Sequence, residues 1–304
     1  MKLGIVSAAL PQLSLDELAH WSAANGFQML ELMCWPVSRA ERRYAGVTHV
    51  DVVDFTKEKA AEVNATMAKY DLEISGLGYY PNPLIADLAQ REFFLAHLQK
   101  VIVAASMLGV PVVNTFIGRD KDKTIEANLD EFAKVWPVVI QFAAEHNVKI
   151  AIENCPMIFS HDEWPGGNNL AISPHVWRQM FAIIPAANFG LNFDPSHLIW
   201  QMIDVERAVY EFGARIFHVH AKDMRIDREQ LYQRGILSAG MGWQIPRLPG
   251  LGEVNWSKFF SALYAVGYDY AVCIEHEDRA FEQTEELVKR GFLIARDVLQ
   301  PYIH

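Results

Sequence analysis

The chain has 304 residues, of which 51% are hydrophobic and 21% charged, so it holds enough apolar surface for a folded core and global disorder is excluded. The 37 acidic residues outnumber the 27 basic ones, and the resulting net charge of −10 argues against nucleic acid as a partner. No apolar stretch reaches the roughly 18 residues that span a bilayer, so no membrane partner is expected.

The three cysteines, Cys34, Cys155 and Cys273, lie far apart in the sequence and form no CxxC pair. An odd count with this spacing fits neither a disulfide framework nor a zinc site built from thiolates. We therefore expect a reducing, cytoplasmic location.

Short apolar runs alternate with longer segments of helical period along the whole chain. The expected strands are Leu3–Ser7, Met29–Met33, Glu73–Gly78, Val112–Ile117, Lys149–Asn154, Gly190–Asp194, Ile216–Ala221 and Ala271–His276. The expected helices lie near 14–25, 56–70, 87–109, 124–146, 173–184, 204–213, 255–266 and 281–300. Ser14, followed three residues later by Glu17, predicts a capping box at the first helix.

Strands that alternate with helices pair in parallel through right-handed crossovers, and eight such units close into a barrel. No linker or shift in composition divides the chain. The sequence therefore predicts an α/β protein with one (β/α)8 barrel domain over residues 1–304. Its two long connections, 155–172 after the fifth strand and 222–254 after the seventh, are expected to cover the active face.

Four consecutive strands end in residues of types that commonly bind metal ions: Glu153, Asp194, His220 and Glu275. Because side chains alternate between the two faces of a strand, all four belong to the series that points into the barrel. They also lie at the carboxyl ends of their strands, where barrel active sites are built. The pattern predicts that the four side chains meet around one point.

Three carboxylates at one barrel mouth repel each other unless a cation neutralises them. Three carboxylates and one imidazole form a mostly hard ligand set, which suits one divalent ion in five- or six-coordination. We expect Mn2+ first, with Co2+, Mg2+ or Zn2+ as alternatives.

The segments around these residues are Ile152-Glu153-Asn154, Asn192-Phe193-Asp194-Pro195-Ser196-His197, His218-Val219-His220-Ala221-Lys222-Asp223 and Ile274-Glu275-His276. Together with Gly26-Phe27, Glu31 and the stretch Pro249-Gly250-Leu251-Gly252-Glu253-Val254-Asn255-Trp256, they resemble the xylose isomerase-like superfamily of TIM barrels. The resemblance covers essentially the whole chain. It implies a sugar isomerase or epimerase, with ketose 3-epimerases and inosose dehydratases among the relatives.

By this resemblance Glu153, Asp194, His220 and Glu275 are the metal ligands, and Glu153 and Glu275 also act as catalytic acid and base on opposite sides of the substrate. His197 resembles the family histidine that contacts a substrate oxygen. The sequence departs from the ketose 3-epimerases in two places. Phe159 stands where they carry a substrate-binding glutamate, and their substrate-binding arginine corresponds at most to Arg225.

A metal-bound carbonyl acidifies the neighbouring C–H bond, so a carboxylate can remove that proton to give an enediolate. Return of the proton isomerises or epimerises a ketose, keto-polyol or keto-sugar, whereas loss of a β-substituent makes the protein a lyase or dehydratase acting on an inosose or 3-keto-glycoside. A barrel subunit without catalytic activity is a second alternative. A metal-dependent phosphodiesterase acting on abasic DNA is disfavoured by the acidic composition.

Other candidate substrate contacts remain open between a binding and a structural role. Lys222 is interpreted either as a strand-end salt bridge or as a group that contacts a substrate oxygen, and His218 as a buried structural group. Trp164 and Trp243, like Trp35, Tyr80 and Phe116, fall at or just after strand ends, and several of these residues can form an apolar wall against a sugar ring. Acidic residues follow Glu275 and favour an unphosphorylated substrate. The sequence does not define an oligomeric state, but the apolar residues of the second long connection, Ile236, Leu237 and Trp243, offer a contact surface for a homo-oligomer.

Overall fold

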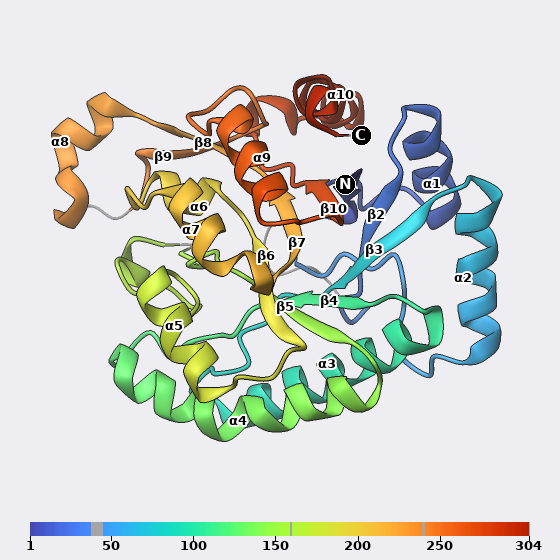
Figure 1. Ribbon diagram of the computed structural model, residues 1–304, viewed down its shortest axis with the longest axis horizontal. Helices are drawn as coiled ribbons and strands as arrows, with labels where there is room; N and C mark the ends of the chain where they lie inside the picture. The colour runs from blue at the N-terminus through green and yellow to red at the C-terminus, as the bar shows by residue number, and fades with distance from the viewer. Residues whose placement is uncertain (38–44, 159, 239–240, 304) are drawn as a thin grey trace.

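The computed structural model describes residues 1–37, 45–158, 160–238 and 241–303, so Phe159 lies outside the described residues. Eight parallel strands form a closed barrel (Figure 1). They are β1 (Lys2–Val6), β2 (Met29–Met33), β3 (Glu73–Gly78), β4 (Val112–Thr115), β5 (Lys149–Glu153), β6 (Phe189–Phe193), β7 (Ile216–Ala221) and β10 (Ala271–Ile274). The predicted (β/α)8 barrel is confirmed.

The barrel closes between the two ends of the chain. Strand β1 pairs with β10 from Lys2 opposite Ala271 to Ile5 opposite Ile274, and with β2 on its other side. Parallel pairing throughout brings the carboxyl ends of all eight strands to one rim. That rim is where the predicted ligand residues lie.

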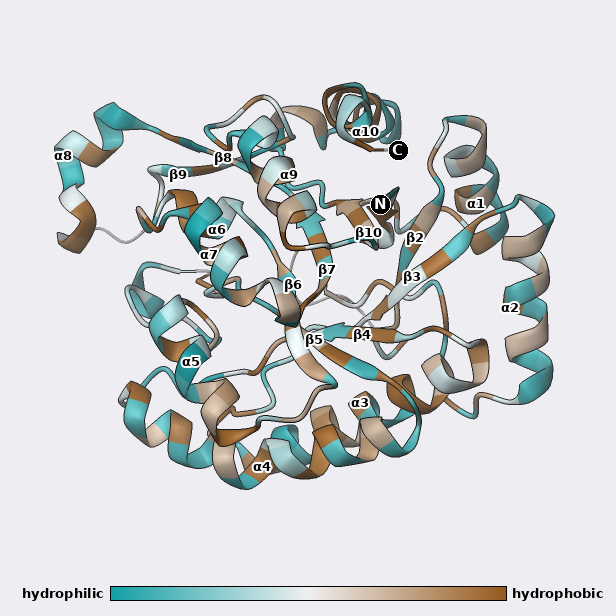
Figure 2. Cartoon of the chain, viewed as in Figure 1, coloured by the Kyte–Doolittle hydropathy of each residue, from teal (hydrophilic) through white to brown (hydrophobic). Residues whose placement is uncertain are grey.

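Helices cover the outside of the barrel, and their polar and apolar stretches are visible in Figure 2. They are α1 (Leu15–Ala24), α2 (Lys57–Lys69), α3 (Leu88–Leu108), α4 (Ile125–Glu145), α5 (Pro174–Ile183), α7 (Val205–Phe212), α9 (Trp256–Ala265) and α10 (Glu285–Leu299). The predicted capping box is present at α1: the Glu17 amide donates to Ser14 Oγ at 3.3 Å, and the Ser14 amide donates to Glu17 Oε2 at 2.9 Å. It satisfies amide groups that a helix start otherwise leaves unpaired.

The main core lies between the strands and the helices. Ile150 and Ile152 of β5 and Leu191 and Phe193 of β6 belong to this cluster and are inaccessible to solvent. Alternate residues of a strand face opposite sides of the sheet. Because these four side chains face the helices, the residues between them point into the barrel. A smaller apolar cluster, which includes Met29, Ala271 and Cys273, lies separately from the main core.

The connection after β7 contains secondary structure that the sequence pattern did not predict. Strands β8 (Asp223–Ile226) and β9 (Gln244–Arg247) form an antiparallel pair, with α8 (Arg228–Ser238) between them. Helix α8 stands away from the barrel (Figure 1). A short helix, α6 (Ser196–Ile199), follows β6 and carries His197 to the rim. Among the described helices, none is both long and apolar enough to cross a bilayer.

Candidate metal and substrate site

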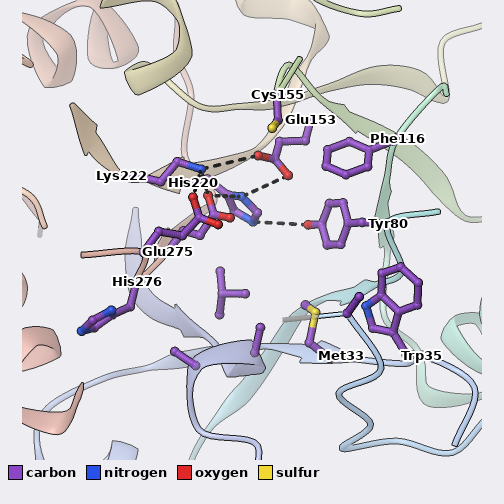
Figure 3. Close-up of a pocket in the computed structure, with 15 residues that line it drawn as sticks. Met33, Trp35, Tyr80, Phe116, Glu153, Cys155, His220, Lys222, Glu275 and His276 are labelled. Atoms are coloured by element: carbon purple, nitrogen blue, oxygen red, sulfur yellow. Dashed lines mark hydrogen bonds and ion pairs between the residues drawn. The ribbon is translucent and has the colours of Figure 1, made fainter. Parts of the chain in front are cut away.

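The four predicted ligand residues come from adjacent strand ends. Glu153 is the last residue of β5, Asp194 follows β6, His220 lies in β7, and Glu275 follows β10. Ligand atoms of Glu153, His220 and Glu275 all lie within 4.8 Å of one another. His220 Nδ1 is 3.8 Å from Glu153 Oε2 and 3.3 Å from Glu275 Oε2, so the two glutamates approach the imidazole together (Figure 3).

Lys222 connects Asp194 to this group. Its Nζ lies 3.0 Å from Asp194 Oδ2, 2.7 Å from Glu275 Oε2 and 3.2 Å from Glu277 Oε2. Burial disfavours the ammonium, but Asp194, Glu275 and Glu277 outweigh that effect and raise the pKa of Lys222 well above its ordinary value. Lys222 therefore makes the strand-end salt bridges that one interpretation of the sequence predicts. It also lines the pocket, as a contact with a substrate oxygen requires.

Glu31 orients His220 from below. This β2 carboxylate is fully buried and accepts a hydrogen bond from His220 Nε2 at 2.6 Å, and the Tyr80 hydroxyl also donates to it. With Nε2 held by Glu31, Nδ1 is the nitrogen that faces Glu153 and Glu275. A carboxylate behind a histidine ligand is a common device that fixes the ring and its tautomer.

His218 lies one layer deeper and has partners for both ring nitrogens. Nδ1 is 3.0 Å from Asn192 Oδ1, and Nε2 is 3.1 Å from Ser75 Oγ. Burial lowers the pKa of His218 to about 3, so the ring is neutral. The geometry fits the structural role predicted for it.

His197 projects from α6 towards the carboxylates. Its Nε2 lies 3.1 Å from Asp194 Oδ2 and 3.7 Å from Glu153 Oε1. Burial disfavours its charged form, yet neighbouring groups that include Asp194 more than compensate and raise the pKa of His197. It is thus brought into contact with two of the predicted ligand residues.

The pocket above these groups has a polar and an apolar side. Its polar lining comprises Glu153, Cys155, His220, Lys222, Glu275, His276 and Glu277. Its remaining lining comprises Val6, Ala8, Ala9, Met33, Trp35, Ala45, Tyr80 and Phe116. A ligand with a polar edge and an apolar face, such as a sugar ring, matches this division.

Three predicted substrate contacts lie elsewhere. Trp164 and Trp243 pack with Trp200 at ring-centroid distances of 5.9–6.1 Å, and none of the three lines the pocket. Trp243 is only 1% exposed, so it contributes little to any surface between subunits. Arg225 is exposed on β8 and does not line the pocket either.

Buried atoms without hydrogen bonds test whether the site suits a cation. Asp194 Oδ2, His197 Nε2 and His220 Nδ1 are all buried and make no hydrogen bond, although ion-pair partners lie nearby. Buried polar atoms are normally satisfied, and these three are oxygen and nitrogen atoms that commonly bind divalent ions. The residues present therefore fit a bound divalent cation.

Sequence reasoning did not identify Glu31, Cys155 or Glu277 as site residues, whereas it named Tyr80, which lines the pocket, as a candidate for the apolar wall. A signal was present for Glu31, because it is the one charged residue in the apolar run Met29–Met33. Its position in the alternation places it on the strand face that points into the barrel. Burying its carboxylate there without a partner would cost free energy. Its partner, however, is 189 residues away in the sequence, and no local spacing relates the two.

A family model described as "Xylose isomerase-like TIM barrel" matches residues 19–297. The chain belongs to the xylose isomerase-like TIM-barrel family. The uncharacterized protein YfiH of Bacillus subtilis (strain 168) is 27% identical over 306 residues, covering 91% of this chain and 93% of YfiH.

Two solved structures show the same fold. D-Psicose 3-epimerase with D-tagatose, from Clostridium cellulolyticum H10, aligns with a TM-score of 0.71 and 16% identity, covering 100% of both chains. The IolI protein with a bound zinc atom aligns with a TM-score of 0.70 and 17% identity, covering 100% of this chain and 99% of IolI.

Proposed function

We propose that the protein is a divalent-metal-dependent sugar isomerase or epimerase that acts on a ketose, keto-polyol or keto-sugar. Glu153, Asp194, His220 and Glu275 would hold the ion. The donor set favours Mn2+, with Co2+, Mg2+ and Zn2+ as alternatives. The epimerase and the zinc-binding protein of the same fold support this proposal.

One observation carries the proposal. Glu153 and Glu275 both approach His220 Nδ1 at one side of a pocket whose opposite side is apolar. Two carboxylates on a common pocket can remove a proton from one face of a substrate carbon and return it to another position or face. Trp35 and Phe116 can pack against the apolar face of the sugar meanwhile.

The ion, when bound, supplies polarisation of a carbonyl and acidifies the adjacent C–H bond. The chain supplies the proton acceptor. Burial favours protonated Glu153, but His197 and His220 outweigh this effect and lower the pKa of the carboxyl, so Glu153 is ionised at neutral pH. Lys222, held by Asp194 and Glu275, offers an ammonium at the pocket wall for a substrate oxygen.

The test is solvent deuterium wash-in across ketoses, inososes and 3-keto-glycosides, with metal analysis of the purified protein. Deuterium in a recovered isomer is expected. Deuterium exchange with loss of water or aglycone would instead assign a lyase. An absence of exchange on every substrate, in protein with a full complement of metal, would assign a barrel without this catalytic activity.

We also propose that residues 1–304 form one cytoplasmic domain. Pairing of β1 with β10 supports the first part, because the two ends of the chain complete one barrel. The three free cysteines support a reducing location.

A further inference from the structure

We infer that Asn154 and Asn169 are positioning residues that hold Glu153 and Asp194 at the spacing which a bound ion requires. This role rests on the metal site of the proposed function. Both asparagines are completely buried and neither lines the pocket, so neither can contact a substrate bound there. Each side-chain amide instead binds backbone groups at the rim where the strands end.

The regular pairing of strand β5 with its two neighbours stops at this rim. The β4–β5 ladder ends with Thr115 opposite Ile152, and the β5–β6 ladder ends with Glu153 opposite Asn192. Beyond these pairs, the two ladders no longer set the distance between the chains. Other groups must fix the strand ends that present the carboxylates.

Asn154 joins the end of β5 to Asp194. Its Nδ2 donates to the Asp194 carbonyl at 2.9 Å, and its Oδ1 accepts from the Asp194 amide at 2.8 Å. The side chain thus pairs with both backbone polar groups of one residue, as a neighbouring strand would. The Ser196 amide donates to Asp194 Oδ1 at 2.8 Å, which leaves Oδ2 directed at Lys222 and His197.

Asn169 binds the end of β5 from the other side. Its Nδ2 donates to the Glu153 carbonyl at 2.9 Å and to the Cys155 carbonyl at 2.7 Å. Its Oδ1 accepts from the Ile117 amide at 3.1 Å and from the Gly118 amide at 3.3 Å. A side-chain amide has two donor hydrogens and two acceptor lone pairs, and Asn169 uses all of them. It thereby joins the end of β5 to the segment after β4.

The long connection after β5 holds Asn169 in this place. The Leu170 amide donates to the Gly118 carbonyl at 3.1 Å. Gly167 has a φ of 68°, and a Cβ there would lie 2.1 Å from the Pro156 carbonyl oxygen, so the turn before Asn169 accepts no side chain. Asn169 is therefore in position in the metal-free protein.

The two carboxylates need this control because they approach the same partners. His197 Nε2 lies 3.7 Å from Glu153 Oε1 and 3.1 Å from Asp194 Oδ2. Lys222 Nζ lies 4.0 Å and 3.0 Å from the same two oxygens. Groups that bind an ion must keep their geometry within about 0.5 Å. A larger shift of either strand end would weaken the site although every ligand residue is present.

The test is calorimetric titration of the metal-free full-length protein with Mn2+, together with the visible absorption of its Co2+ complex. Asn154→Ala and Asn169→Ala should each raise the dissociation constant for Mn2+ by about 10–100-fold. They should also alter the Co2+ bands, which report the geometry of the ligands. Asn154→Ser and Asn169→Ser keep one polar atom and should give smaller changes, and they serve as the test where an alanine variant does not fold.

Asn128→Ala separates positioning from a structural role. Asn128 on α4 is 1% exposed and binds the Asp120 backbone as Asn154 binds that of Asp194, with Oδ1 accepting from the amide at 2.8 Å and Nδ2 donating to the carbonyl at 3.0 Å. Asp120 does not line the pocket. Urea denaturation should show reduced stability in all three alanine variants, but Asn128→Ala should bind Mn2+ as wild type does. An equal loss of affinity in Asn128→Ala would overturn the positioning role.

Metal binding is measured without a substrate, so the failure of this role and that of the proposed reaction are distinguishable. Wild-type affinity and unchanged Co2+ bands in folded variants at Asn154 and Asn169 would overturn the positioning role alone. A wild type that binds Mn2+ but exchanges no deuterium would overturn the reaction alone. A wild type that binds no divalent ion would overturn both.

Discussion

Glu31 shows how much of the site depends on a residue outside the pocket. Its carboxylate holds His220 Nε2 at 2.6 Å, and burial, reinforced by Glu31, raises the pKa of Tyr80 well above its ordinary value. Tyr80 therefore remains a hydrogen-bond donor to Glu31 at neutral pH. The ring of His220 is held from behind before any ligand arrives.

Replacing the Glu31 carboxylate should weaken metal binding although all the proposed metal ligands are retained. Glu31→Gln keeps the side-chain size but loses the charge behind His220, and changes of this kind typically cost 10–100-fold in metal affinity. Calorimetric titration of the metal-free variant with Mn2+ should give a dissociation constant about 10–100-fold higher than wild type. An unchanged affinity would contradict the positioning role.

The proposed acid and base are tested one at a time. Glu153→Gln and Glu275→Gln should each reduce turnover of an identified substrate by at least about 100-fold, because proton transfer by a positioned group contributes that much. Circular dichroism should be unchanged. Glu145→Gln, at an exposed position on α4, is the matched control. Near-full activity in either site variant would refute the assigned chemistry.

At the scale of elements, Asp223 ties the β8–β9 pair to the loop before α9. Oδ1 accepts from the amides of Met224 at 2.8 Å and Val254 at 2.9 Å. Oδ2 accepts from the Gly250 amide and from Trp256 Nε1, both at 3.0 Å. Gly252 must lack a side chain here, because a Cβ would lie 2.2 Å from Asp223 Oδ1.

Removal of this carboxylate leaves four donors without their acceptor. We expect Asp223→Ala to lower the free energy of unfolding by about 2–4 kcal/mol, since Asp223 is fully buried. Asp204→Ala, which removes an exposed helix cap, should cost about 1 kcal/mol. Urea denaturation of both variants measures the difference, and equal losses would show that the four-way contact adds nothing.

His97 gives the packing of α3 a dependence on pH. Its Nε2 lies 2.7 Å from the Cys34 carbonyl, and its ring packs on Tyr79. Burial lowers the pKa of His97, so the folded state binds fewer protons than the unfolded state below about pH 6.5. Stability contributed by neutral His97 is therefore complete above that pH and is lost as the pH falls.

The corresponding measurement compares unfolding free energies at about pH 7.5 and about pH 5.5. Wild type should lose more stability on acidification than His97→Gln, whose amide does not titrate and can still donate to the Cys34 carbonyl. The same loss in both proteins would exclude His97 as the source.

Prediction from sequence succeeded where a side chain's role depends on its own strand or helix. The apolar alternation around Glu153 and Asp194 identified both the strands and the inward face, and the Ser14–Glu17 pattern identified a helix start. The β8–α8–β9 segment was missed because Pro246 disfavours a strand and Gly235 interrupts the helical pattern of α8.

The remaining misses depend on contacts between distant segments. Trp164, Trp200 and Trp243 come from three separate segments and pack on one another instead of lining the pocket. Nothing in the sequence around any one tryptophan distinguishes that arrangement from a wall against a sugar. Glu277 likewise became a partner of Lys222 only through the closure of β10 on β7.

For the whole molecule, closure of the barrel depends on close packing at Gly4. A Cβ at this position would lie 2.6 Å from the Met29 carbonyl oxygen and 2.8 Å from Cys273 Sγ, on the two strands that flank β1. Gly4→Val should therefore lower the unfolding free energy by about 3 kcal/mol, at the upper end of overpacking costs. Lys2→Val, on the same strand but partly exposed, should change it by less than about 0.5 kcal/mol.

Calorimetry of the two variants separates strain from any general effect of valine in β1. A similar unfolding free energy for Gly4→Val and wild type would show that β1 can move apart from its two neighbouring strands without a loss of stability.

The two walls of the pocket come from different parts of the fold, one from strands and one from loops, and this difference affects how substrate range can evolve. Glu153 and His220 belong to barrel strands, and Glu31 anchors His220 from a third, whereas Trp35 and Phe116 lie just beyond strands β2 and β4. Strand positions are constrained by pairing on both sides, but loop positions tolerate substitution and changes in length. Under the proposed function, mutations in the loops can therefore select among sugars of different shape while Glu153 and His220 keep their places. Laboratory evolution towards a new substrate should begin with Trp35 and Phe116.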